Sequence, residues 1–251
     1  MAKLTKNQTK LHNQACDLLT KNVLTEDEKE FIFKNWNEGA YHINGMAGAF
    51  FTPFDMAFDF AIDAVGSGDY DGTVVDFCAG IGILSYACHW RSNKNVKLTC
   101  VEINPDYYEI GKKLLPEAEW INADIFDFME TGRHFDVAIS NPPFGNVKRT
   151  KNSFRYTGRE FEYHVIDIAS QMADYGSFIV PQMSAGFDYS GKQCYKRHES
   201  GRAVNFQELT GMHFDTGVGI DTKYYQNDWK GVSPICEVVS VDFIEMRERK
   251  I

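Results

Sequence analysis

"TVVDFCAGIGILSYACHW", residues 73–90, decides the fold. Its first five residues form a mainly β-branched, apolar run that predicts a buried strand, and its last eight have the apolar spacing of a helix. Between them, "CAGIG" predicts a tight turn in which Gly80 and Gly82 let the backbone approach a ligand closely. A strand that passes through a glycine turn into a helix is typical of a parallel, doubly wound sheet.

The same alternation continues along the chain. Two segments near the end, 214–225 and 234–245, predict strands without a helix between them, and therefore an antiparallel pair at the sheet edge. We expect an α/β fold, a Rossmann-like seven-stranded, mostly parallel doubly wound sheet with an antiparallel edge strand, plus N-terminal helices. The other expected strands are 97–103, 118–125, 135–140 and 176–182, and the other expected helices are 54–66, 105–115 and 159–173.

The N-terminal part has a different pattern. Residues 4–20 predict one helix, and a second begins at Thr25, because Thr25 and Glu28 have the spacing of a capping box. A glycine-rich loop follows and ends at Pro53. We therefore expect two units, an N-terminal helical cap over residues 1–40 and a domain built on the sheet over residues 41–251.

Composition narrows the function classes. The formal net charge of -9 argues against a protein that coats nucleic acid by bulk electrostatics, although local basic patches remain compatible with it. The six cysteines form no C-x-x-C pair and have no histidine at metal-ligand spacing, which favours free thiols in a reducing cytosol and no metal site. No signal peptide or membrane-spanning apolar run is evident, so we expect a cytoplasmic protein without a membrane partner.

Polar residues end four successive strands of the predicted sheet. Asp76 and Glu102 close the first two strands, Asp124 follows the third, and Asn141 follows the fourth. The carboxyl ends of adjacent parallel strands share one crevice, so these side chains are expected to converge. Each acid alone is equally well explained as a solvated strand-end cap, but polar residues at the ends of four successive strands favour a ligand site.

The positions of these acids indicate the ligand. Glu102 lies about 20 residues beyond Gly82, where an acid accepts hydrogen bonds from both hydroxyls of a ribose. Asp124 is placed to accept from an adenine amino group. Ser85 stands where a dinucleotide fingerprint has its third glycine, and no G-K-[ST] sequence is present. A cationic nucleoside without phosphate, S-adenosylmethionine, suits such acids better than NAD or ATP.

A further stretch, "AISNPPFG" at residues 138–145, places two prolines and an aromatic residue after Asn141. With this stretch the chain resembles the class I S-adenosylmethionine-dependent methyltransferases, and among them the amino-methyltransferases with an [N/D/S]-P-P-[Y/F/W] motif. "DFCAGIG", "VEIN" and "NADIF" resemble the family's cofactor loop, ribose acid and adenine contact. "AFFTP" upstream, and the order of the motifs, are similar to the gamma group of DNA adenine-N6 methyltransferases, which includes modification subunits of restriction systems.

The resemblance covers roughly residues 45–185 and implies roles for individual residues. Two features depart from the family: the chain has no room for a large target-recognition domain, and Phe144 replaces the tyrosine of many relatives. The resemblance implies that S-adenosylmethionine is bound by Phe51, Thr52, Pro53, Asp76, Cys78, Ala79, Gly80, Gly82, Glu102, Ile103, Asp124, Ile125 and Asn141.

The Asn-Pro-Pro-Phe motif is the expected catalytic centre, formed by Asn141, Pro142, Pro143 and Phe144. If the Asn141 oxygen and the Pro142 carbonyl each accept one hydrogen of an exocyclic amine, its lone pair turns toward the methyl donor and the developing charge is stabilised. The prolines make the turn rigid, and Phe144 would stack on the base.

Two basic loops predict the substrate. They follow the fourth and fifth strands, and they combine positive charge with aromatic residues, a composition suited to phosphate contacts and base stacking. We expect nucleic acid, with DNA adenine favoured over RNA and with a restriction or accessory subunit as a candidate partner. Open alternatives are an RNA adenine or guanine methyltransferase, a protein glutamine-N5 methyltransferase, and a non-catalytic binding subunit. The expected substrate-binding residues are Lys148, Arg149, Lys151, Arg155, Lys196 and Arg197.

Overall fold

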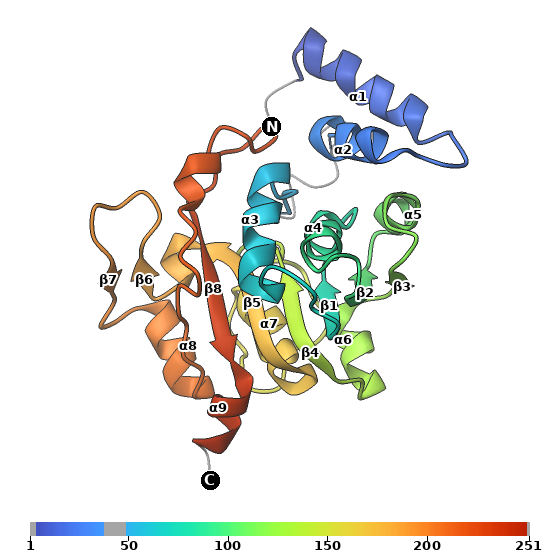
Figure 1. The fold of residues 1–251 in the computed structure, drawn as a ribbon. Helices are drawn as coiled ribbons and strands as arrows, with labels where there is room; N and C mark the ends of the chain where they lie inside the picture. The colour runs from blue at the N-terminus through green and yellow to red at the C-terminus, as the bar shows by residue number, and fades with distance from the viewer. Residues whose placement is uncertain (1–3, 38–48, 250–251) are drawn as a thin grey trace.

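The computed structural model describes residues 4–37 and 49–249. Its centre is a sheet of six strands in the order β3-β2-β1-β4-β5-β8, in which β8 alone runs antiparallel to its neighbour (Figure 1). The α/β fold with an antiparallel edge strand is thus confirmed. The strands are β1 (Thr73–Phe77), β2 (Lys97–Glu102), β3 (Glu119–Asn122), β4 (Phe135–Ser140), β5 (Ala173–Pro181) and β8 (Cys236–Asp242).

Helices cover both faces of this sheet. Neighbouring residues of a strand point to opposite faces, so Val137 and Ile139 of β4 pack in one apolar core and Ala138 between them packs in the other. One face carries α3 (Phe54–Val65), α4 (Ile83–Arg91) and α5 (Pro105–Leu114), and the other carries α6 (Ile125–Phe128), α7 (Phe161–Met172) and α9 (Phe243–Glu248) (Figure 1). Between β5 and β8 the chain also forms the two-stranded ribbon of β6 (Phe187–Asp188) and β7 (Lys196–Arg197), then α8 (Arg202–Thr210).

The expected seventh strand over residues 214–225 is wrong. Only an isolated bridge between Asp215 and Ser240 joins this segment to β8, and Thr222–Tyr225 forms a 3₁₀ turn. Gly217 and Gly219 have φ values of 53° and 75°, a left-handed conformation that cannot continue a strand. The apolar pattern was strand-like, but the two glycines bend the backbone away from the sheet.

The two N-terminal helices are α1 (Lys6–Leu18) and α2 (Glu26–Asn35). The expected capping box is present, because the Thr25 hydroxyl accepts from the Glu28 amide and the Glu28 carboxylate accepts from the Thr25 amide. Ile32 and Phe33 of α2 are buried in the same apolar core as α3 and α4. The glycine-rich segment and the expected domain boundary at residues 40 and 41 lie outside the described residues, so the division into two units stays a prediction.

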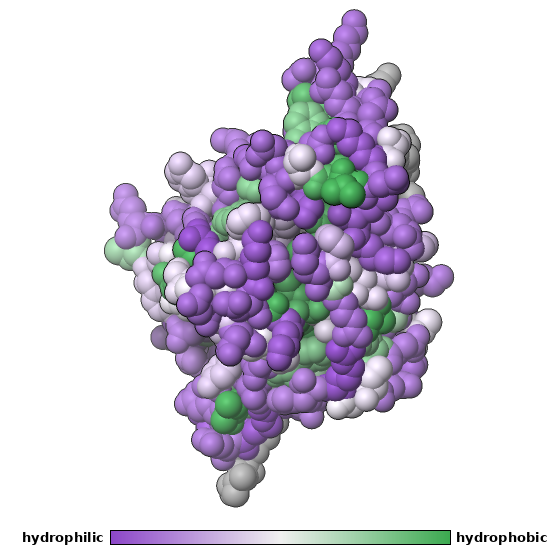
Figure 2. All heavy atoms as spheres, turned by 45° about the vertical axis from the view of Figure 1, so that its right-hand side comes forward, coloured by the Kyte–Doolittle hydropathy of each residue, from purple (hydrophilic) through white to green (hydrophobic). Residues whose placement is uncertain are grey.

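The surface is mainly hydrophilic on the face shown in Figure 2, with apolar side chains in separate small groups. In the described parts of the chain, no helix combines the length and the apolar character needed to cross a membrane.

Replacing Ile32 by Ala is expected to lower the free energy of unfolding of the whole protein by about 2–4 kcal/mol, because it leaves a cavity in the shared core. Urea titrations followed by circular dichroism and tryptophan fluorescence measure this, and both signals should move together in one transition. Asp27→Asn, on the exposed side of α2, is the control and should change stability by less than about 0.5 kcal/mol. A separate early transition that alone shifts would contradict a shared core.

Candidate active site

The polar strand-end residues come together in one cavity of about 290 Å³. Asp76, Glu102, Asp124 and Asn141 all line it, as expected for the carboxyl ends of neighbouring parallel strands. Of the residues predicted to bind the cofactor, all but two line this cavity. The exceptions are Pro53 and Gly82, which stand at the N-caps of α3 and α4.

The turn after β1 is folded tightly against the cavity. Cys78, Gly80 and Gly82 have φ values of 58°, 58° and 89°, so this turn uses the left-handed region three times within five residues. The Gly80 amide donates to Glu102 Oε2 at 2.7 Å. A β-carbon on Gly80 would lie 2.8 Å from the ring of Phe51, so a side chain there would displace the cavity wall.

Two buried carboxyl groups form the polar floor of the site. Glu102 is 6% exposed, and besides the Gly80 contact its Oε1 accepts from the Asn104 amide at 2.8 Å. Asp76 is 1% exposed and accepts from the Ser85 hydroxyl at 2.8 Å. Burial raises the pKa of both carboxyl groups to about 7, so each is poised to ionise when a ligand donates to it.

Asp124 has a structural role of its own. It is the N-cap of α6, where its Oδ1 accepts from the Phe126 amide at 3.0 Å. It also lines the cavity. The helix-cap explanation and the ligand explanation therefore apply to the same side chain.

The orientation of the Asn141 amide is fixed by its neighbours. Its Nδ2 donates to the Phe50 carbonyl at 2.7 Å and to the Thr52 hydroxyl at 3.0 Å. A carbonyl can only accept, so the nitrogen must face Phe50 and Oδ1 is left as an acceptor. The Ser140 hydroxyl next to it donates to the Phe77 carbonyl and joins the ends of β4 and β1.

The rest of the motif is divided between the cavity and the core. Pro143 lines the cavity beside Asn141, whereas Pro142 is buried outside its lining. Phe144 is half-buried against the apolar core on the α3–α5 face, and it does not line the cavity either. Stacking of Phe144 on a base stays a prediction.

The loop after the motif is tied to α7 by a buried glutamate. Glu162 is 1% exposed, and it accepts from the Gly145 amide and the Ser184 hydroxyl, both at 2.8 Å. Lys148 and Arg149 of this loop line the cavity. The sequence analysis did not single out Glu162, because an acid within a helix is usually exposed to solvent.

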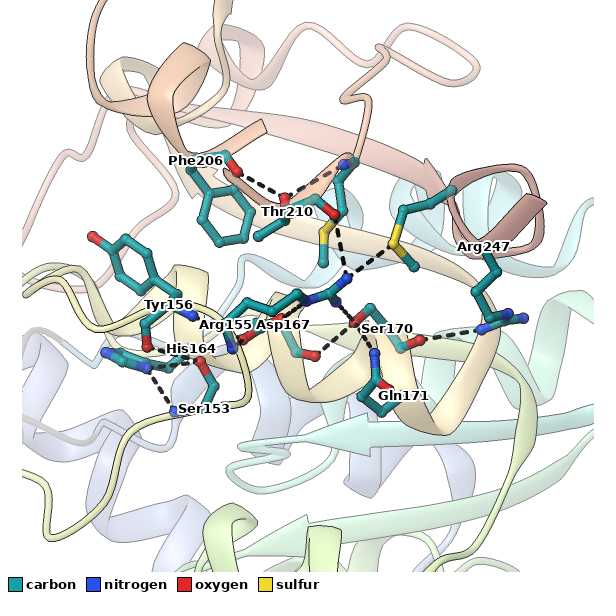
Figure 3. Close-up of polar contacts among 12 residues, drawn as sticks. Ser153, Arg155, Tyr156, His164, Asp167, Ser170, Gln171, Phe206, Thr210 and Arg247 are labelled. Atoms are coloured by element: carbon teal, nitrogen blue, oxygen red, sulfur yellow. Dashed lines mark hydrogen bonds and ion pairs between the residues drawn. The ribbon is translucent and has the colours of Figure 1, made fainter. Parts of the chain in front are cut away.

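Arg155 lies in a different environment from the other predicted substrate residues. Its Nε donates to Asp167 Oδ1 at 2.8 Å and its backbone amide donates to Oδ2 at 2.6 Å, while the Asp167 side chain is fully buried (Figure 3). The guanidinium also donates to the Thr210 carbonyl and the Ser170 hydroxyl. Arg155 therefore binds the loop to α7 and α8, and we do not retain it as a substrate contact.

The remaining predicted cations do not line the cavity. Lys151 forms ion pairs with Asp127 and Glu130 at 3.1 and 2.7 Å. Lys196 and Arg197 form β7, and Arg197 donates to the Phe214 carbonyl at 2.9 Å.

Several lining residues were missed by the sequence analysis. Most have apolar side chains, which from sequence alone are indistinguishable from ordinary core residues. Tyr107 carried the clearest signal, since it follows Asn104 at the start of α5, directly beyond the ribose acid. The missed residues are Ala49, Phe50, Ile83, Leu84, Val101, Asn104, Tyr107, Ala123, Phe126, Val147 and Phe161.

Comparison with known proteins shows that the chain is similar to methyltransferases. Residues 44–157, somewhat less than half of the chain, match the model of the methyltransferase small domain family. The resemblance to class I methyltransferases is confirmed. A tRNA1(Val) (adenine(37)-N6)-methyltransferase of Histophilus somni is 28% identical over 97 residues, which span 34% of this chain and 41% of that relative.

Solved structures agree on the methyltransferase fold. The methyltransferase subunit of a type I restriction-modification system from Streptococcus thermophilus superposes with a TM-score of 0.54 at 14% identity, covering 85% of this chain and 49% of that one. A candidate class I methyltransferase from Listeria monocytogenes gives a TM-score of 0.53 at 11% identity, covering 95% and 81%. At such identities these similarities concern the fold alone.

The methyltransferase family implies S-adenosylmethionine as the cofactor, and the cavity fits it. Both oxygens of Glu102 are held by backbone amides, which leaves the outward lone pairs free to accept from ribose hydroxyls. The acids of the floor suit a cation, and the cavity walls are mainly apolar. The carboxyl groups of Asp76 and Glu102 line the cavity next to the glycine turn and would repel a pyrophosphate, whereas the two cations of the lining, Lys148 and Arg149, come from the loop after β4.

Replacing Asp167 by Asn is expected to lower the free energy of unfolding by about 3 kcal/mol, because the Arg155 guanidinium loses its buried counter-charge and an amide NH₂ faces the donors of Arg155. Urea unfolding measures the change. Asp174→Asn is the matched control, since Asp174 pairs with Arg247 at the surface and should cost less than about 1 kcal/mol. Equal losses in the two variants would contradict a buried anchor.

Proposed function

We propose that this protein transfers the methyl group of S-adenosylmethionine to an exocyclic amino nitrogen of a nucleic-acid base, with adenine N6 as the leading target. The observation that carries the proposal is the fixed amide of Asn141, whose nitrogen is held by Phe50 and Thr52 while its oxygen remains an acceptor at the cavity. A turn that merely ended a strand would need no such orientation.

The residues of the cavity would divide the binding of the cofactor among them. When bound, the cofactor supplies an electrophilic methyl group on a sulfonium. Glu102 would accept from the ribose hydroxyls, Asp124 from the adenine amino group, and Asp76 would provide negative charge near the cationic end. Phe51 would pack against the methionine part, in line with its position across from Gly80.

Asn141 and Pro142 would prepare the amine for transfer. An exocyclic amine on adenine has its lone pair delocalised into the ring. Hydrogen bonds from its two hydrogens to Asn141 Oδ1 and the Pro142 carbonyl would draw the nitrogen toward tetrahedral geometry and stabilise the charge that develops on it. The scheme requires no general base, and alignment of the amine with the methyl group contributes the rest.

The choice of nucleic acid rests on two observations that point in different directions. The upstream Phe51-Thr52-Pro53 segment and the motif order favour DNA adenine. The sequence relative from Histophilus somni is named for adenine-N6 methylation of tRNA, which supports RNA. Methylation of adenine N6 is common to both possibilities, so we propose adenine N6 as the target. The experiment below decides between DNA and RNA.

The test is methyl transfer from labelled S-adenosylmethionine to unmethylated DNA and, separately, to unmodified tRNA. Each product is digested to nucleosides and identified by mass. N6-methyladenosine or its deoxy form supports the proposal and names the polymer. A methylated guanine alone would overturn the choice of adenine, and transfer to neither polymer with cofactor bound would overturn the nucleic-acid proposal.

Asn141→Ala is expected to abolish methyl transfer, because it removes one of the two acceptors for the amine. Cofactor affinity, measured by calorimetry, should stay within a few fold. Thr52→Val is the comparison: it removes one anchor of the Asn141 amide but keeps the acceptor oxygen, so it should lower kcat much less. Loss of cofactor binding together with transfer in Asn141→Ala would indicate a structural role for the turn.

Cofactor affinity is expected to rise with pH up to about 8. Burial raises the pKa of Glu102 to about 7, and ribose hydroxyls donate to the ionised form, so a proton competes with the ligand below that value. Glu102 alone should make the dissociation constant about tenfold higher at pH 6 than at pH 8, and any contribution of Asp76 adds to this. In the ligand-free protein the same burial lowers folding stability as pH rises from the usual glutamate range to about 7.

Calorimetric titration across this pH range checks the prediction. Glu102→Gln should bind the cofactor more weakly and lose much of the pH dependence, with Asp76 accounting for what remains. A flat profile in the unmodified protein would show that neither carboxyl changes its ionisation on binding.

A further inference from the structure

A second hollow, of about 330 Å³, lies on the loop directly after the Asn-Pro-Pro-Phe motif. It is lined by the consecutive residues 146–152, and we call it the loop hollow. Val147, Lys148 and Arg149 line both the loop hollow and the cofactor cavity, so the two share a wall. A group held in the loop hollow would therefore lie beside a base held at Asn141.

The lysines of the loop hollow differ in their charge environment. The Lys151 ammonium is neutralised by Asp127 and Glu130, with which it forms two ion pairs. Lys148 is exposed, and within the described chain no hydrogen bond or ion pair joins its ammonium to another residue. Lys148 thus presents an uncompensated positive charge at the wall between the loop hollow and the cavity.

Arg149 adds a second positive charge and shapes the loop. Its Nε and Nη2 donate to Asn152 Oδ1, each at 3.2 Å, and Nη2 also donates to the Gly158 carbonyl. These acceptors are neutral, so they fix the guanidinium without cancelling its charge. The loop hollow therefore keeps a net positive charge in a chain whose formal net charge is -9.

The loop is held in shape by buried contacts at its far end (Figure 3). The His164 Nε2 lies 3.0 Å from the Gly158 carbonyl and must donate to it, so Nδ1 is the acceptor for the Ser153 amide at 3.1 Å. The Ser153 hydroxyl lies 3.0 Å from the same Nδ1 and also contacts the Tyr156 carbonyl. Burial lowers the pKa of His164, which keeps this neutral form. Together with the Arg155–Asp167 pair, these bonds order the loop without any ligand.

We propose that the loop hollow binds a phosphate group of the nucleic-acid substrate, next to the target base, through Lys148 with the charge of Arg149 behind it. This inference rests on the proposed function and adds a defined subsite to it. A carboxylate of the cofactor is the competing anion, because Lys148 also lines the cavity. Phosphate is favoured because most of the loop hollow, residues 150–152 and Asn146, lies outside the cavity lining.

The test is equilibrium binding of short fluorescein-labelled single-stranded DNA and RNA containing adenine, in the presence of S-adenosylhomocysteine and over a range of salt concentrations. Lys148→Ala should weaken binding and reduce the slope of log affinity against log salt by about 0.7–0.9, the contribution of one phosphate contact. Lys148→Arg should restore the slope. Cofactor affinity of each variant is measured by calorimetry and should stay within twofold.

Two controls separate this site from general charge effects. Lys97→Ala removes the same charge at the amino end of β2, across the sheet from the cavity, and should leave the slope unchanged. Lys151→Ala removes a charge that is already paired, and should change the slope less than Lys148→Ala does.

The outcomes distinguish this inference from the proposed function. An unchanged slope in Lys148→Ala, with binding intact in the unmodified protein, overturns the phosphate subsite alone. Weakened cofactor binding with unchanged nucleic-acid binding would assign Lys148 to the cofactor carboxylate and also overturns it. Nucleic-acid binding with the expected slope change in Lys148→Ala, but without methyl transfer by the unmodified protein, supports the subsite and overturns the proposed function. Absence of nucleic-acid binding in the unmodified protein overturns both.

Discussion

Backbone amides that leave the sheet must find acceptors, and in this protein buried carboxylates supply them. The loops that carry the candidate site begin where the ladder of the parallel sheet ends, so their N–H groups have no strand to pair with. Glu102 accepts from Gly80 and Asn104, and Glu162 accepts from Gly145. Asp167 accepts from Arg155 and Tyr156, and Glu237 accepts from Tyr189 and Ser190. An unpaired buried amide is costly, so these acids stabilise one conformation of the loops around the candidate site.

Some charged side chains near the candidate site hold its loops in place, whereas others remain available to a ligand. Arg155 and Lys148 are seven positions apart in one basic loop, and composition treats them alike. The Arg155 charge is matched by a buried carboxylate, and its removal would disturb folding. The Lys148 charge is exposed beside the cavity. In a chain with an excess of acids, an exposed cation beside the candidate site that no carboxylate matches is informative for substrate binding.

The parts of the fold and site that the sequence predicted are those decided by local pattern. Strand ends are marked by the change from apolar runs to turn residues, so Asp76, Glu102 and Asp124 could be placed at one edge. Whether residues 214–225 form a strand depends instead on the backbone conformation of Gly217 and Gly219, which the apolar pattern does not reveal. The Arg155–Asp167 pair was missed because its members belong to a loop and a helix, and only packing brings them together. The apolar lining was missed because core and ligand contact require the same side chains.

The segment before α3 contacts both the expected cofactor site and the Asn141 amide. Phe51 packs opposite Gly80 on the side where the cofactor is expected, while its neighbours Phe50 and Thr52 accept both hydrogens of the Asn141 amide. A displacement of this short segment would therefore move the cavity wall and turn the acceptor oxygen at the same time. Under the proposed function, cofactor binding and presentation of the amine acceptor are mechanically linked through three consecutive residues. The upstream position of "AFFTP", which was only a motif in the sequence, then has a physical reason: it orients the catalytic amide from outside the motif.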